Sequence, residues 1–78
     1  MKKDIFLIYN IFLKTGTQTI DNVSFTNKDK AIEYIESKLT KEEILKTRNA
    51  KNRNLISWYE FLSKDYNYYI KVVSLIGD

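Results

Sequence analysis

The stretch that decides the fold is "IFLIYNIFL", residues 5–13, in which only Asn10 is polar. A membrane-spanning helix needs about 20 apolar residues, and this run ends after nine, at Lys14. The residues that follow, "LKTGTQTID", lack the small-residue cleavage site of a signal peptide. An apolar run of this length is typical of a strand that is buried on both faces. We therefore expect a central strand, with neither a membrane anchor nor a leader.

The chain turns back at "KTGT", where Gly16 can adopt the positive φ that a tight turn requires. The next segment, "TQTIDNVSFT", predicts a second strand with imperfect alternation. Val23 and Phe25 share a face, whereas Ile20 is out of phase with them. We expect a β-bulge near Asp21–Asn22, because one extra residue in a strand shifts the alternation.

Two helices are expected next. The segment "TNKDKAIEYIESKL" predicts the main amphipathic helix over about Lys28–Leu39, with Thr26 or Asn27 as its cap. Its apolar stripe consists of Ala31, Ile32, Ile35 and Leu39. In "TKEEI", Thr40 and Glu43 have the spacing of a capping box. A shorter helix is therefore expected after Thr40.

The last third of the chain predicts a hairpin. "LISWYEFL" and "YNYYIKVVSLI" are rich in β-branched and aromatic residues and flank the polar turn "SKDYN". "SWYEFL" also fits a helix with Ser57 as its cap and Glu60 at the third position, which leaves residues 57–63 open between strand and helix. The fold class expected for residues 1–78 is a single α+β domain. Its four-stranded, mainly antiparallel sheet has the order β-β-α-(α)-β-β, with one main amphipathic helix.

The composition disfavours an enzyme. Cysteine and histidine are absent, which excludes disulfides, thiolate metal sites and the usual proton shuttle. The two glycines are too few for a phosphate-binding loop. Glu42 and Glu43 are adjacent, and neighbours on a helix point about 100° apart. We expect no enzymatic activity, no cofactor and no metal, and the absence of cysteine suits a reducing cytoplasm.

A basic stretch and a group of tyrosines are the candidate binding residues. "KTRNAKNRN", residues 46–54, carries four positive charges in a chain whose net charge is +3. This stretch could be a contact surface that binds phosphates or an acidic protein. The alternative is a solvated connection between two elements. The tyrosines near the last turn either stack on a partner, such as unpaired bases, or pack across strands. The partner-binding residues expected from this pattern are Lys46, Arg48, Lys51, Arg53, Tyr66 and Tyr68.

The chain also has more apolar strand surface than one helix can cover. The first strand is apolar on both faces and the last strand nearly so. One helix layer covers only one face of a sheet. The other face is expected to be covered by residues 42–54 or left for a partner. That partner could be a second copy, which would form a homodimer through the same face or through edge strands.

The order of elements, with "VSFTNKDKAIEYIESKL" followed by "YNYYIKVVSLI", resembles small α+β proteins of phages and mobile elements, including the anti-CRISPR inhibitors. The resemblance implies a non-catalytic inhibitor that binds a host protein or nucleoprotein complex, such as a CRISPR-type defence complex, in the bacterial cytoplasm and away from membranes. The alternative is a small nucleic-acid-binding module that uses the basic stretch and the tyrosines.

Overall fold

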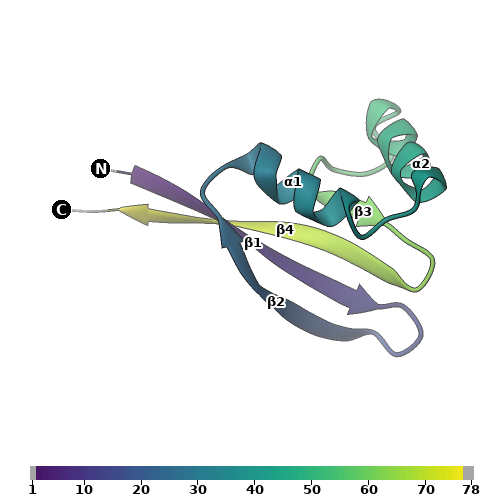
Figure 1. Cartoon of the computed structure of the whole chain (residues 1–78), viewed down its shortest axis with the longest axis horizontal. Helices are drawn as coiled ribbons and strands as arrows, with labels where there is room; N and C mark the ends of the chain where they lie inside the picture. Colours follow the sequence, from purple (N-terminus) through teal and green to yellow (C-terminus); the bar gives the residue numbers. More distant parts are fainter. Residues whose placement is uncertain (1, 77–78) are drawn as a thin grey trace.

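The computed structural model describes residues 2–76, which form four strands and two helices (Figure 1). In chain order these are β1 (Lys2–Phe12), β2 (Thr17–Phe25), α1 (Lys28–Glu36), α2 (Lys41–Asn52), β3 (Glu60–Leu62) and β4 (Tyr66–Ile76). The strands make one sheet in the order β2-β1-β4-β3, and every pairing is antiparallel. The predicted α+β class, with a four-stranded antiparallel sheet and two helices, is confirmed.

The two central strands are β1 and β4, and they pair over their whole length. The register runs from Lys2 opposite Ile76 to Phe12 opposite Tyr66. Both strands extend beyond α1 at the end where the chain begins and finishes (Figure 1). The first and last strands of the sequence therefore form the middle of the sheet.

The turn and the bulge between β1 and β2 agree with the sequence. Gly16 has a φ of 74° and donates its N–H to the carbonyl of Phe12 at 2.7 Å. The register shifts between Leu7, opposite Ser24, and Tyr9, opposite Ile20. Three residues of β2 thus lie across from one residue of β1, which places Ile20 beside Tyr9 on one face of the sheet.

The core lies between α1 and the sheet. Ile8 and Ile70 are opposite each other in β1 and β4, and both are buried. The full buried cluster consists of Ile8, Ala31, Ile35, Phe61 and Ile70. Ile32 and Leu39, the other members of the predicted stripe, pack against this cluster. Even-numbered positions of β1 and β4 therefore face the helices.

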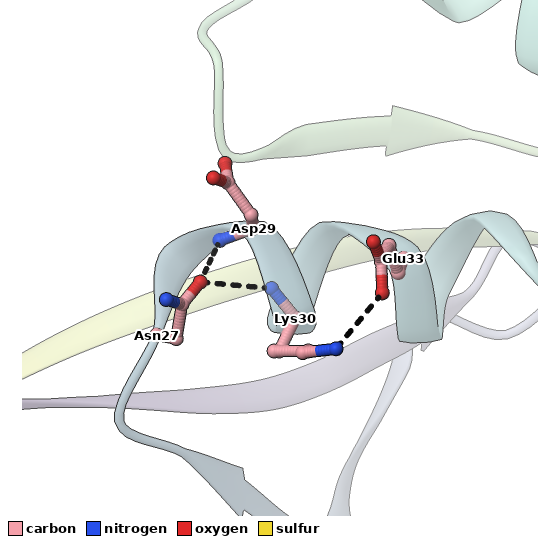
Figure 2. Close-up of polar contacts among 4 residues, drawn as sticks. All are labelled: Asn27, Asp29, Lys30 and Glu33. Carbon is pink, nitrogen blue, oxygen red and sulfur yellow. Dashed lines mark hydrogen bonds and ion pairs between the residues drawn. The ribbon is translucent and has the colours of Figure 1, made fainter.

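α1 begins at a cap of the kind that the sequence predicts. Asn27 is the N-cap, and its side-chain oxygen accepts hydrogen bonds from the N–H groups of Asp29 at 2.8 Å and Lys30 at 3.2 Å (Figure 2). Lys30 also forms an exposed ion pair with Glu33, at 3.8 Å (Figure 2). The cap satisfies donors that the first turn of a helix leaves without a partner.

The end of α1 differs from the prediction. The helix ends at Glu36 instead of Leu39. The Ser37 hydroxyl donates to the carbonyl of Tyr34 at 2.6 Å, and Leu39 donates its N–H to Glu36, three residues back, at 3.1 Å. Serine competes for backbone groups in this way and so favours the end of a helix.

α2 is longer than the short helix expected. The Thr40–Glu43 capping box is present, with Glu43 accepting from Thr40 N–H at 2.8 Å. The helix continues to Asn52, so most of the basic stretch is helical and is not a connecting loop. It closes with Asn54 at a φ of 56°, and Leu55 donates its N–H to Ala50 at 2.8 Å.

β3 is much shorter than the predicted strand. Only Glu60–Leu62 pair with β4. Residues 57–60 form a turn in which Ser57 N–H donates to the Glu60 carboxylate at 3.0 Å and Glu60 N–H donates to the Ser57 carbonyl at 3.1 Å. The capping signal at Ser57 is therefore real, but it closes one turn and does not start a helix.

Candidate protein-binding surface

Both helices lie on the same face of the sheet (Figure 1). α1 packs on Ile8 and Ile70, while α2 lies over β3. Two contacts fix α2 there: the Thr47 hydroxyl is hydrogen bonded to the backbone of Leu62, and Lys51 Nζ lies 3.4 Å from the centre of the Phe61 ring. Phe61 belongs to the core on the helix side. Residues 42–54 therefore do not cover the opposite face.

We call that opposite face the open face. It carries the odd-numbered side chains of β1 and β4 together with Ile20, because side chains alternate along a strand. Its apolar and aromatic members are Ile5, Leu7, Tyr9, Ile11, Ile20, Tyr69, Val73 and Leu75. Ile20 is 65% exposed and Leu75 is 48% exposed. Both helices of residues 2–76 lie on the other face, so within this range no helix layer covers these apolar side chains.

The open face is hollowed into a groove of about 600 Å³. The groove crosses the sheet from Ile20 on β2, over Leu7 and Tyr9 on β1, to the turn before β3. There, Trp58 and Tyr59 meet edge to face, with ring centres 5.6 Å apart. Large aromatic side chains bury much area at little entropic cost, which suits them to anchoring a partner.

The chemistry of the open face is apolar and aromatic, with a positive charge. Tyr9 and Tyr69 stack with ring centres 5.1 Å apart and planes 16° from parallel. Burial, and then Tyr69, Tyr59 and Glu60, raise the pKa of Tyr9, so its hydroxyl stays protonated at neutral pH. Lys71 lines the groove and is exposed. The open face is therefore mainly apolar and aromatic, with Lys71 in the groove and Glu60 opposite Tyr69 as nearby charged residues.

Two of the four predicted basic residues are engaged within the chain. Arg48 binds the Glu36 carboxylate through both Nε and Nη2, at 3.1 and 2.9 Å, and so joins α2 to α1. Lys51 lies on the face of Phe61, and burial lowers its pKa to about 8. The charged groups of Arg48 and Lys51, which were expected to bind a partner, therefore make contacts within the chain instead.

The other two basic residues lie at the surface of α2. Lys46 is exposed and borders a small hollow with Glu42 and Glu43. Arg53 is exposed and is the C-cap, donating its N–H to the Asn49 carbonyl at 3.0 Å. α2 therefore presents fewer available positive charges than the sequence suggests.

The predicted tyrosines pack across strands. Tyr66 lies 5.1 Å from Phe12 and 6.2 Å from Tyr68, measured between ring centres. Tyr68 also packs against the core, and burial raises its pKa. The cation–π contact of Lys51 is with Phe61 and not with these tyrosines. The structure brings the two tyrosines together but does not join them to the basic residues.

The sequence did not single out Ile20, Trp58, Tyr59 or Lys71 as candidate site residues. A signal for Ile20 was present, since its break in alternation places it with Tyr9 once the bulge is counted. Trp58 and Tyr59 reach the groove because the chain turns just before a short β3. The Ser57–Glu60 hydrogen bonds of that turn are local, but the pairing of β3 with β4, which fixes where the turn lies, joins segments that are distant in sequence from the groove residues of β1 and β2.

No family model, curated protein or solved structure matches the chain. Within residues 2–76, no three acidic side chains are placed to hold a metal ion. No helix in the same range has both the length and the apolar character to cross a membrane.

Proposed function

We propose that this chain is a small non-catalytic binding protein that covers a surface of another protein, with the open face as its contact surface. The observation that supports this proposal is the uncovered apolar groove between Ile20 and Tyr59. Large apolar patches are rare on soluble monomers and mark interaction sites. Aromatic anchors inside a groove are typical of the centres of protein interfaces.

The resemblance to phage and mobile-element proteins suggests a narrower form of this proposal. In that form, the target is a protein of a bacterial nucleoprotein complex, such as a CRISPR-type defence complex, and binding inhibits it. The direct test adds the purified protein to such a complex and measures cleavage of target DNA. Cleavage should fall with increasing protein, and unchanged cleavage across several defence types would contradict the narrower form.

The general proposal is tested with two matched variants. Ile20→Lys adds a charge at the rim of the groove, and Leu45→Lys adds the same charge on α2. The two side chains are 65% and 60% exposed, so both variants should fold. Proteins retained from a bacterial lysate by the wild type and by Leu45→Lys, but lost with Ile20→Lys, bind through the open face. Equal retention by all three proteins would contradict the role of that face.

Binding of nucleic acid makes a different prediction. A module that grips phosphates binds naked DNA or RNA, and its affinity falls steeply with salt. Because Arg48 and Lys51 are engaged with Glu36 and Phe61, we expect no such binding. Salt-dependent binding of naked DNA or RNA would contradict the protein-binding proposal. Loss of that binding in a Lys46→Ser, Arg53→Ser double variant would support a nucleic-acid-binding function.

A further inference from the structure

One edge of the sheet is unpaired over half of its length. β3 pairs only with residues Asn67, Tyr68 and Tyr69 of β4, and Ile70 donates its N–H to the Tyr59 carbonyl at 3.0 Å. Backbone groups of alternate residues point to the same side of a strand. Val72, Ser74 and Ile76 therefore direct their N–H and C=O groups outward, where no strand within residues 2–76 pairs with them.

This free edge belongs to a part of the sheet that the helices leave bare. The ends of β1 and β4 project beyond α1 as a two-stranded ribbon (Figure 1). Two strands alone are marginally stable in water, whereas additional strands stabilise them. In this ribbon Val72, Leu75 and Ile76 are 41%, 48% and 83% exposed. Within residues 2–76, this part of β4 thus has an unpaired backbone edge and exposed apolar side chains.

The two edges of the sheet differ in how well they are protected against pairing with a strand of another chain. Sheet edges are usually guarded by charges, proline or bulges, which prevent pairing with other chains. β2, at one edge, carries a bulge and Asp21. The segment "VVSLI", residues 72–76, has no charge and no proline, and it pairs with β1 without a register shift. Only the β4 edge has the features of a strand that accepts another.

We propose that this edge binds a second copy of the chain, β4 to β4 and antiparallel about a two-fold axis. With the two Ser74 residues opposite each other, Val72 of one copy faces Ile76 of the other, and Val73 faces Leu75. Every cross-strand pair beside the axis is then apolar, and the register makes about six backbone hydrogen bonds. Because the pairing starts at Val72, it does not compete with β3.

The exposed area of the molecule supports a second copy. The chain exposes 5795 Å², about 800 Å² more than a compact protein of its mass. One subunit of a standard interface contributes about that area. Two sheets would join into one eight-stranded sheet, with the two open faces on the same side. The proposed dimer depends on the backbone edge of residues 72–76, whereas the proposed function depends on the groove between Ile20 and Tyr59, and Val72 borders both. Ile20→Lys changes the groove alone and Ser74→Pro changes the edge alone, so the failure of one proposal can be told from the failure of the other.

The test is a pair of substitutions at Ser74, whose Oγ donates to Asp4 at 2.7 Å. Ser74→Pro removes the outward N–H, whereas Ser74→Ala removes the same hydroxyl and keeps the N–H. Both changes remove the side-chain hydrogen bond to Asp4 of β1. Neither removes a backbone hydrogen bond between β1 and β4, because the N–H groups that reach β1 come from odd-numbered residues. Sedimentation equilibrium at micromolar to submillimolar concentration should find dimers for the wild type and Ser74→Ala, and monomers for Ser74→Pro.

A wild type that is monomeric throughout this range, or a Ser74→Pro protein that dimerises equally well, would overturn the proposal. Amide exchange of the wild type gives a second measurement that does not depend on the proline variant folding. The amides of Val72, Ser74 and Ile76 should exchange more slowly as protein concentration rises. Exchange that is fast and independent of concentration would also overturn it.

Discussion

At the scale of single residues, Asn54 holds a backbone conformation that most side chains avoid. Its φ is 56°, and Leu55 just beyond it donates to Ala50 in the pattern that closes a helix. Asn54→Ala should lower the free energy of unfolding by about 1 kcal/mol, because a Cβ without a polar group makes the left-handed region unfavourable. Asn52→Ala, two residues earlier at the last position of α2, is the control and should change the free energy of unfolding by less than about 0.5 kcal/mol in urea denaturation. Equal free energies of unfolding for the two variants would contradict the idea that Asn54 is favoured by its left-handed backbone conformation.

Lys51 gives the stability a dependence on pH. Burial lowers its pKa from 10.5 to about 8, with smaller effects of Glu36, Arg48 and Lys28. Between these values the unfolded chain binds more protons at this residue than the folded chain, so the residue destabilises the fold less as pH rises. Lys51→Met should therefore melt at a higher temperature than the wild type at pH 7, and this advantage should narrow toward pH 10.

Comparing the two proteins at each pH cancels the titration of every group that they share. The Phe61 ring opposes the effect of burial, because a ring face attracts a cation. An advantage of Lys51→Met that stays constant from pH 7 to 10 would show that the ring contact offsets the burial.

At the scale of elements, one threonine joins α2 to β3. Thr47 is 1% exposed, and its hydroxyl accepts from Leu62 N–H at 3.0 Å and donates to the Leu62 carbonyl at 3.3 Å. Thr47→Val keeps the shape but leaves these backbone groups without a partner, which should cost about 1–3 kcal/mol of unfolding free energy. Thr47→Ser keeps the hydroxyl and should cost about 0.8 kcal/mol for the lost methyl. Urea denaturation of both variants tests this order, and a Val variant at least as stable as the Ser variant would contradict it.

The elements also show what the sequence can and cannot predict. β1 and the start of α1 follow from local signals, namely an apolar run and an Asn cap. The length of α2 does not, because its only buried residue is the polar Thr47, and an apolar stripe is the signal that sequence reasoning uses. The side of the sheet on which α2 lies depends on contacts of Thr47 and Lys51 with residues at least ten positions away. The open face could therefore be expected, but not located.

At the scale of the whole molecule, association should be visible in the stability. A partner that binds only the folded state raises the melting temperature with its concentration. If two copies pair through β4, the melting temperature of the wild type should rise with protein concentration, while that of Ser74→Pro should not. Scanning calorimetry over a hundredfold dilution series checks this, and a wild-type melting temperature independent of concentration would contradict it.

The pairing of the first strand with the last has a consequence for how the chain is made. Asp4 and Ser74 are neighbours in the sheet although 70 positions separate them in sequence. β1 leaves the ribosome before β4, so its two apolar faces remain partly exposed to water until β4 is synthesised and pairs with it. Chains dominated by such distant pairings fold in about milliseconds to seconds. A nascent chain that stalls before β4 therefore displays its most apolar segment, and that truncated product is the form that chaperones and proteases would meet.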